Sequence, residues 1–115
     1  MEDKNREICL SYLRKYANKD ICGIQEMFSE NIVLRDWKIH VIGKKNALIE
    51  TRKNFESASS IEIEVISTFD NVDTLAAELK ITVDSTEILY VVDLITINSD
   101  CKIKSIRAYL GRGAD

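Results

Sequence analysis

The sequence predicts an α+β domain in which helices pack on one face of a curved antiparallel sheet. Two observations support this fold class. Segments with helical hydrophobic spacing dominate the first half of the chain, and segments that alternate apolar and polar residues dominate the second half. At 115 residues the chain can build one hydrophobic core but not two, and it contains no internal repeat or linker. We therefore expect residues 1–115 to form a single domain.

Composition and charge exclude several classes of protein. The net charge is −3, so no basic surface is expected for binding nucleic acid or a membrane. No apolar segment approaches the length that spans a bilayer, and the residues after Met1 lack the pattern of a signal peptide. Cys9, Cys22 and Cys101 have no metal-ligand spacing, so reduced thiols in a cytoplasmic protein are the simplest interpretation.

Two amphipathic helices are expected at the start of the chain. Between Asp3 and Ala17, apolar side chains recur at intervals of three and four residues and share one helix face: Cys9, Tyr12, Leu13 and Tyr16. Tyr16 is interpreted as a core residue. Asp20 suits the N-cap of a second helix running to about Ser29. The apolar side of this second helix would be formed by Ile21, Ile24, Met27 and Phe28.

The hydrophobic period changes to two after the second helix. In the segment Ile32–Asp36, alternation places Asp36 on the same face as two apolar residues, which is an unusual position for a carboxylate. The alternative is that Asp36 only ends the strand as a turn residue. The extended segment continues to Val41 and contains His40, the only histidine, which is expected on the surface. Gly43 then precedes a third helix at about residues 46–57.

Four strands are expected from Ser60 onward, joined by turns rich in Asp, Asn and Ser. In the first of them, alternation places four apolar residues on one face: Ile61, Ile63, Val65 and Phe69. The four predicted strands are residues 61–69, 75–83, 88–97 and 102–110.

The third of these strands, Ile88–Ile97, is an apolar run with Asp93 at its centre. A buried carboxylate is costly, so Asp93 should be paired with an arginine or a backbone amide, or should keep its proton. The outward side of this strand is also apolar: Ile88, Tyr90, Val92 and Leu94. A second copy of the chain is the natural cover for this face, which predicts a two-fold homodimer.

The order of these elements resembles the nuclear transport factor 2-like superfamily, which includes ketosteroid isomerases and SnoaL-like polyketide cyclases. The resemblance covers nearly the whole chain and rests on residues 18–24 (NKDICGI), 29–34 (SENIVL) and 103–109 (IKSIRAY). It implies a cone-shaped fold in which a curved antiparallel sheet wraps around three N-terminal helices.

The sharper resemblance is to ketosteroid isomerase. Counting from Asp20, Tyr12 and Asp36 match the family's oxyanion-hole tyrosine and general base, and Asp93 matches its protonated aspartate. That enzyme is a known case of a carboxylic acid kept neutral by an apolar site. The resemblance implies a cofactor-independent isomerase acting on a small apolar ligand that contains a carbonyl group. The pocket walls would be Trp37 near the mouth, Val91, Ile106, Ala108 and Leu110.

Several positions depart from the isomerase pattern. Phe28 and Thr51 stand about where some of these enzymes carry further tyrosines, so Tyr12 would lack a hydrogen-bond relay, and Leu110 replaces an aromatic residue. Two alternatives therefore stay open. One is a SnoaL-like polyketide cyclase or lyase-type enzyme, and the other is a non-catalytic dimeric module that binds a small molecule. Limonene-epoxide-hydrolase chemistry is disfavoured, because it needs an Asp-Arg-Asp set and no arginine shares the pocket face.

Overall fold

The computed structural model describes residues 1–113 and has the predicted α+β architecture, with helices and strands in the expected order. The helices are α1 (Asp3–Ala17), α2 (Ile21–Met27) and α3 (Lys44–Ser57). The strands are β1 (Phe28–Arg35), β2 (His40–Ile42), β3 (Ile61–Asp70), β4 (Thr74–Val83), β5 (Glu87–Ile97) and β6 (Ile103–Leu110). No helix within residues 1–113 is both long and apolar enough to cross a membrane.

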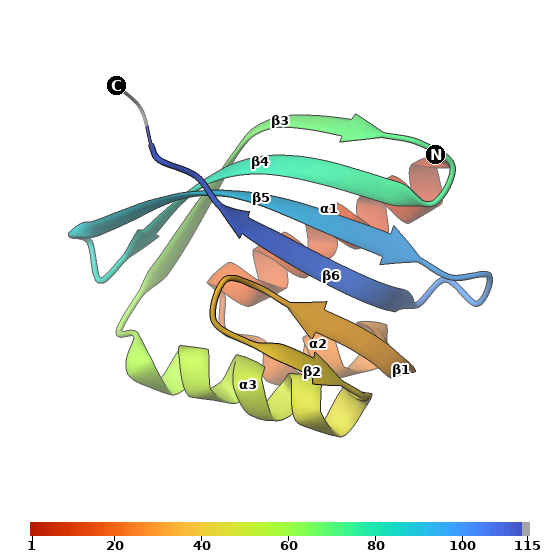
Figure 1. The fold of residues 1–115 in the computed structure, drawn as a ribbon, viewed down its shortest axis with the longest axis horizontal. Helices are drawn as coiled ribbons and strands as arrows, with labels where there is room; N and C mark the ends of the chain where they lie inside the picture. The colour runs from red at the N-terminus through yellow and green to blue at the C-terminus, as the bar shows by residue number, and fades with distance from the viewer. Residues whose placement is uncertain (114–115) are drawn as a thin grey trace.

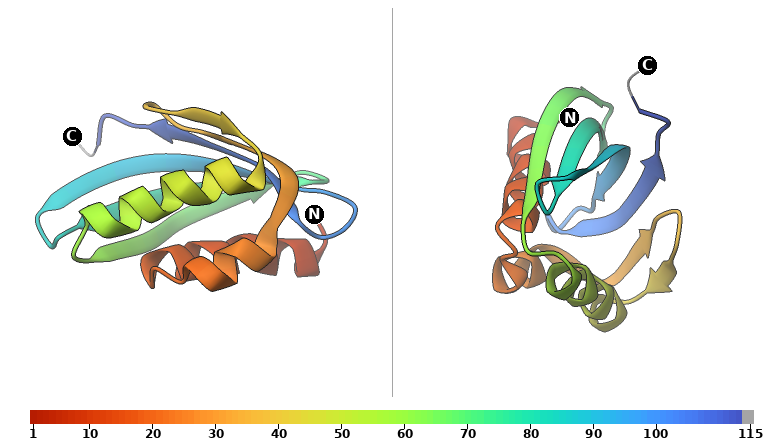
Figure 2. Two further views of the ribbon diagram at one scale, coloured as in Figure 1. Left: turned by 90° about the horizontal axis from the view of Figure 1, so that it is seen from below. Right: turned by 90° about the vertical axis from the view of Figure 1, so that its left-hand side faces the viewer.

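The strands form one curved sheet in the order β2-β1-β6-β5-β4-β3. The sheet bends around α1 and α3, which lie on its concave side (Figures 1 and 2). All neighbouring strands are antiparallel except β1 and β6, which pair in parallel, so the sheet is mixed and not wholly antiparallel as predicted. Alternation shows which side of a strand is buried but not the direction of a partner that is distant in sequence.

The start of the chain follows the prediction, except at the end of the second helix. The bounds of α1 are the expected ones, and Asp20 caps α2 by accepting a hydrogen bond from the Gly23 amide at 2.9 Å. The prediction that Phe28 belongs to the second helix is wrong, because this residue has an extended backbone and begins β1. Its side chain is 1% exposed and packs in the core. A buried aromatic side chain suits either element, so hydrophobic spacing did not reveal where the helix ends.

Gly43 turns the chain from β2 into α3. Its φ angle is 96°, in the region that side chains with a Cβ rarely adopt, which explains a glycine at this position. The helix begins at Lys44, slightly earlier than the predicted start near Asn46. Its buried face, which includes Ala47 and Phe55, contacts the core beneath the sheet.

A β-bulge in β3 changes which side chains of that strand face the core. The pairing with β4 shifts between Val65 and Ser67, so the alternation reverses phase there. The predicted common face therefore holds for Ile61 and Ile63 but fails for Phe69, which is 68% exposed. Phe69 pairs with Ala76 on the convex side of the sheet. An extra residue in one strand leaves no mark in the hydrophobic pattern, which is why the sequence did not predict it.

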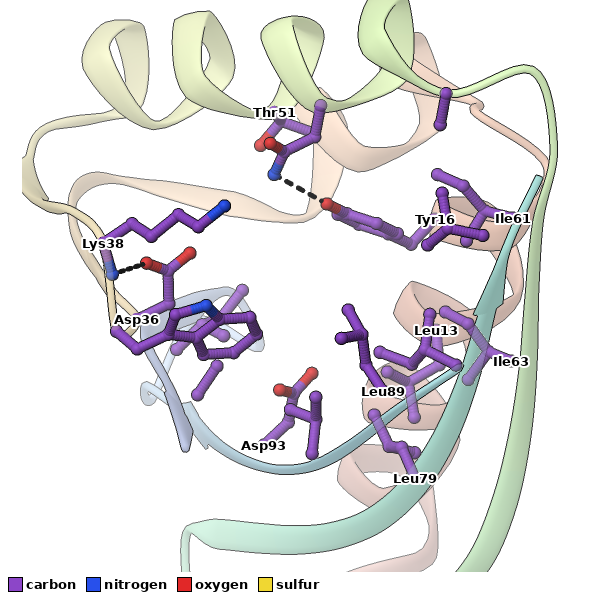
Figure 3. A pocket seen from close by; sticks show the side chains of 18 of the residues that line it. Leu13, Tyr16, Asp36, Lys38, Thr51, Ile61, Ile63, Leu79, Leu89 and Asp93 are labelled. Atoms are coloured by element: carbon purple, nitrogen blue, oxygen red, sulfur yellow. Dashed lines mark hydrogen bonds between the residues drawn. The ribbon is translucent and has the colours of Figure 1, made fainter. Parts of the chain in front are cut away.

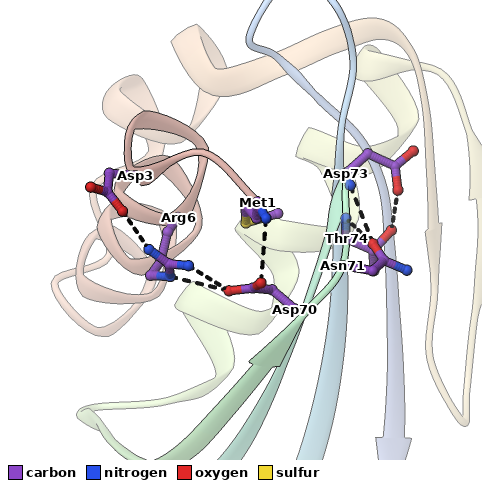
Figure 4. Close-up of polar contacts among 7 residues, drawn as sticks. All are labelled: Met1, Asp3, Arg6, Asp70, Asn71, Asp73 and Thr74. Carbon is purple, nitrogen blue, oxygen red and sulfur yellow. Dashed lines mark hydrogen bonds and ion pairs between the residues drawn. The ribbon is translucent and has the colours of Figure 1, made fainter.

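A polar cluster attaches the first turn of α1 to the end of β3 (Figure 4). The Arg6 guanidinium donates to the Asp70 carboxylate at 2.8 Å and to Asp3 at 2.7 Å, and the Met1 amine lies 3.4 Å from Asp70. In the adjacent turn, the Asn71 side chain accepts a hydrogen bond from the Thr74 amide at 2.9 Å. These contacts set the position of α1 across the concave face, and α1 in turn carries the tyrosines of the site described next.

Candidate functional site

A cavity of about 260 Å³ lies between the concave face of the sheet and the helices α1 and α3 (Figure 3). Its walls are mainly apolar side chains from both layers: Leu13, Leu34, Ile39, Ile61, Ile63, Leu79, Ile81, Val83, Leu89, Val91, Ile106 and Ala108. The polar groups are few and converge on the same space, which is the usual composition of a small-molecule site.

Asp93 projects into this cavity from the middle of β5. Its neighbours on the adjoining strands are Ala77 and Ala108, whose small side chains leave the carboxyl group uncrowded. Asp93 is 9% exposed, and no hydrogen bond to its carboxyl group forms among residues 1–113. Burial raises the pKa of Asp93 to about 7, and the charge of Asp36 adds to this effect. In a substantial fraction of the protein molecules, Asp93 is therefore protonated at neutral pH.

Asp36 lies directly after β1, where the chain turns toward β2. The structure is compatible with both roles considered for it, as a turn residue and as a carboxylate that faces the pocket. Its Oδ1 accepts hydrogen bonds from the amides of Lys38 at 2.7 Å and Ile39 at 2.9 Å, which is the geometry of a turn residue. Asp36 also lines the cavity. Because the turn uses only Oδ1, Oδ2 is left to act on a ligand.

Tyr12 lines the same cavity from α1 and is 4% exposed. Its ring packs against Tyr16 and Phe28, with centroids 6.0 Å and 6.1 Å away. Burial raises the pKa of Tyr12 well above its usual value, and the charges of Tyr16 and Asp93 raise it further, so the hydroxyl stays a neutral donor. No relay reaches that hydroxyl from Phe28, which is apolar, or from Thr51, whose hydroxyl donates to the Ala47 carbonyl at 2.8 Å.

Tyr12, Asp36 and Asp93, which the sequence predicted to act together, thus meet in one cavity. Within residues 1–113, no hydrogen bond joins the Tyr12 hydroxyl to Asp93, and both side chains line the cavity. Their catalytic roles stay a prediction.

Four of the five predicted wall residues also line the cavity: Trp37, Val91, Ile106 and Ala108. Trp37 is 42% exposed, which suits a position at the mouth. Leu110 does not reach the cavity. It pairs with Val91 at the last position of β6 and is 46% exposed, because β1 pairs with β6 only as far as Arg107 and no strand flanks Leu110 on that side.

Sequence reasoning missed several polar residues of the cavity. Tyr16 was interpreted as a core residue, yet it lines the cavity and its hydroxyl accepts a hydrogen bond from Asn54 Nδ2 at 3.0 Å. Lys38 and Glu87 line it as well. The available signal for Tyr16 was its position one helical turn after Tyr12, on the same face of α1.

Neither a metal site nor an epoxide-hydrolase set forms within the described part of the chain. No cluster of three or more His, Cys, Asp or Glu side chains there is placed to hold a metal ion. The charged residues lining the cavity are Asp36, Lys38, Glu87 and Asp93, without an arginine. The Asp-Arg-Asp arrangement of limonene-epoxide hydrolases is therefore not formed by these residues.

The curved mixed sheet, the three helices on its concave side and the cavity between them define the nuclear transport factor 2-like fold. A candidate ketosteroid isomerase from Kribbella flavida superposes with a TM-score of 0.83 at 13% identity, covering 98% of this chain and 82% of that one. A candidate SnoaL-like polyketide cyclase from Shewanella denitrificans gives a TM-score of 0.83 at 9% identity, covering 96% and 92%.

A third solved structure is SalBIII, an epoxide hydrolase/cyclase-like enzyme with a role in forming the pyran ring of the polyether salinomycin. It superposes with a TM-score of 0.82 at 24% identity, covering 97% of this chain and 95% of SalBIII. No protein-family model matches the sequence, and no curated protein matches it significantly. At these identities the likeness establishes the fold alone, and the solved structures that share this fold include candidate isomerases, candidate cyclases and epoxide hydrolases.

Proposed function

We propose that this chain is a small cofactor-independent isomerase that moves a proton next to a carbonyl group, as a steroid delta-isomerase does. The observation that carries the proposal is the placement of Asp93: a buried carboxyl group, whose pKa burial raises to about 7, shares an apolar cavity with a second carboxyl group, Asp36. Two acidic groups whose environments differ in this way are suited to opposite tasks, one donating a proton in a hydrogen bond and the other accepting one.

In the proposed reaction, a β,γ-unsaturated ketone binds with its carbonyl oxygen near Tyr12 and Asp93. Asp36 Oδ2 removes a proton from the carbon between the carbonyl and the double bond, and the electron pair moves onto the carbonyl oxygen to form a dienolate. The two O–H groups stabilise this oxyanion in a site from which water is largely excluded. Asp36 then returns the proton to the far carbon of the former double bond, and the product is the conjugated ketone.

The size of the cavity favours a compact ligand. Its volume, about 260 Å³, lies just below the range of roughly 300–1,000 Å³ that is usual for pockets holding drug-sized molecules. The walls are apolar, so a small apolar compound containing a carbonyl group is the substrate class that we propose.

A SnoaL-like cyclase or lyase-type activity is the second candidate. The observation in its favour is the likeness to SalBIII, which at 24% identity exceeds that to the candidate isomerase. A protonated Asp93 could act as the acid and Asp36 as the base in opening and closing an oxygen-containing ring. In a third candidate, a non-catalytic binding module, the same cavity would hold a ligand without converting it.

Turnover of β,γ-unsaturated ketones tests the proposal directly. Cyclohex-3-enone, a compact substrate, and a β,γ-unsaturated ketosteroid are each incubated with the protein, and formation of the conjugated enone is followed by ultraviolet absorbance. We expect faster turnover of the compact ketone, a loss of about 10²–10⁴ in rate for Asp36→Asn and about 10²–10³ for Asp93→Ala. Asp100→Asn, on an exposed turn, serves as the matched control and should leave the rate unchanged.

Each contrary result selects an alternative. Background rates for all variants would overturn the isomerase proposal. Binding of a phenol that depends on Asp93 would then favour the cyclase or the binding module, which share the cavity but not the reaction.

We also propose that two copies associate through the convex face of β5. The outward side chains of this strand include Ile88, 50% exposed, and Val92, 38% exposed. Tyr109 on the adjacent strand β6, and Phe69 on β3 beyond β4, are further exposed apolar residues of the convex face. A two-fold axis through this face would cover the same patch on both copies. Sedimentation velocity should show a dimer that Val92→Lys dissociates. Val72→Lys, in the exposed turn before β4, should leave the dimer intact, and a monomeric wild type would contradict the proposal.

A further inference from the structure

The Tyr16 hydroxyl is a further hydrogen-bond donor in the cavity, apart from Tyr12 and Asp93, which are assigned to the reaction. Its oxygen accepts a hydrogen bond from Asn54 Nδ2 at 3.0 Å, and a phenol has one proton to donate in addition to what it accepts. Within residues 1–113 the Tyr16 hydroxyl accepts this hydrogen bond but donates none. The Asn54 contact therefore orients the hydroxyl and leaves its proton available to a ligand.

The ring of Tyr16 is held in place by its neighbours. Phe55 lies edge-on at a centroid distance of 4.9 Å and an interplanar angle of 72°, and Tyr12 lies at 6.0 Å and 61°. Burial raises the pKa of Tyr16, and the charges of Asp93 and Asp36 raise it further, whereas the hydrogen bond from Asn54 lowers it. Because burial is the largest effect, the hydroxyl stays protonated at neutral pH. A donor that is fixed and neutral is suited to recognising an oxygen atom at a defined position.

The position of this donor differs from that of the reacting groups. Figure 3 shows Asp93 on the β5 side of the cavity and the Tyr16 hydroxyl on the opposite side, close to α3, where Asn54 donates to it. A ligand whose only oxygen binds at Asp93 supplies no acceptor for the proton of the Tyr16 hydroxyl. The Tyr16 proton would then lose its hydrogen bond to water without gaining another, which is unfavourable in a partly buried site.

We propose that Tyr16, oriented by Asn54, binds a second oxygen of the substrate and so determines specificity. The substrate class becomes a compact ketone with a further acceptor oxygen, such as an ether, carbonyl or hydroxyl, on the side remote from the reacting carbonyl. This inference rests on the proposed function, because it takes the Tyr12 and Asp93 end of the cavity as the place where the carbonyl oxygen binds.

Two isosteric phenols test the inference: 6-methoxy-2-naphthol and 6-ethyl-2-naphthol. Both offer a phenolic oxygen to Tyr12 and Asp93 as mimics of the dienolate, and they differ only in whether an oxygen or a methylene group faces the remote end. Dissociation constants are measured by isothermal titration calorimetry. We expect the wild type to prefer the methoxy compound by about 3- to 10-fold, the range of one net hydrogen bond. Tyr16→Phe should abolish the preference.

Asn54→Asp separates donation by Tyr16 from its packing. A carboxylate at this position accepts the Tyr16 proton instead of donating to its oxygen, so the preference should disappear although the tyrosine is retained. Tyr90→Phe, on the convex face and outside the cavity, is the control and should keep the wild-type preference.

The outcomes distinguish this inference from the proposed function. Equal affinity of the wild type for the two naphthols, together with binding that depends on Asp93, would overturn the role of Tyr16 alone. A preference that persists in Tyr16→Phe would also overturn it. Failure of both naphthols to bind, or binding unaffected by Asp93→Ala, would overturn the proposed function and this inference with it.

Discussion

The protonation of Asp93 makes the stability of the fold depend on pH in a direction that can be measured. Its pKa is about 7 in the folded protein against an ordinary value of 3.8, because burial disfavours the charged form. Between these two values the folded protein holds the proton and the unfolded chain has released it. The free energy of unfolding therefore falls as the pH rises through this window, and the full penalty applies above pH 7.

The size of the effect follows from the same two values. Each pH unit between them contributes about 1.4 kcal/mol, so the full penalty is about 4 kcal/mol. About 3 kcal/mol of it should develop between about pH 5 and about pH 8, where most proteins can be studied reversibly. Asp93→Asn keeps the shape of the side chain and has no proton to lose, so it should lack this contribution.

Urea denaturation followed by circular dichroism measures the free energy of unfolding at each pH. The wild type should lose about 3 kcal/mol relative to Asp93→Asn between about pH 5 and about pH 8. Asp100→Asn, on an exposed turn, should run parallel to the wild type. Parallel pH profiles for the wild type and Asp93→Asn would refute the reasoning, because they would show that Asp93 titrates alike in both states. If the proposed reaction is correct, turnover should also decline as the pH rises through about 7, when Asp93 loses the proton it donates.

Three further substitutions test how the elements around the site are held. Asp20→Ala removes the hydrogen bond to the Gly23 amide and should cost about 1 kcal/mol in urea denaturation; an unchanged midpoint would show that the cap is dispensable. Ile95→Ala, at a fully buried position, should lower the free energy of unfolding by about 2–5 kcal/mol in the same measurement. A decrease below about 1 kcal/mol would mean that neighbouring side chains move in to fill the cavity left by the substitution. Gly43→Ala forces a φ of 96° and a ψ of 146° on a residue with a Cβ, and it should lower the thermal midpoint by an amount equivalent to about 1–3 kcal/mol. The exposed substitution Lys45→Ala should change the midpoint little, and an equal effect of the two would contradict the role assigned to Gly43.

Much of the fold could be predicted from residue types and spacing. Helical periodicity located α1 at its observed bounds, and a capping residue located the start of α2. The alternation around Asp36 and the apolar run around Asp93 mark both carboxylates as unusual in the sequence itself, and both line the cavity. These inferences succeeded because periodicity and capping act over a few residues, a range that the sequence displays directly.

The tertiary structure alone decided the features that depend on distant contacts. Three features depend on segments that come together only when the chain folds. They are the parallel pairing of β1 with β6, the bulge in β3 that turns Phe69 outward against β4, and the hydrogen bond between Asn54 and Tyr16. Leu110 stays outside the cavity lining for a related reason: its alternation is correct, but β1 pairs with β6 only as far as Arg107 and leaves Leu110 exposed. The sequence by itself determined which faces are apolar and which acids are out of place among them. Where those faces meet, and hence which side chains share a cavity, was set by packing between elements far apart in the chain.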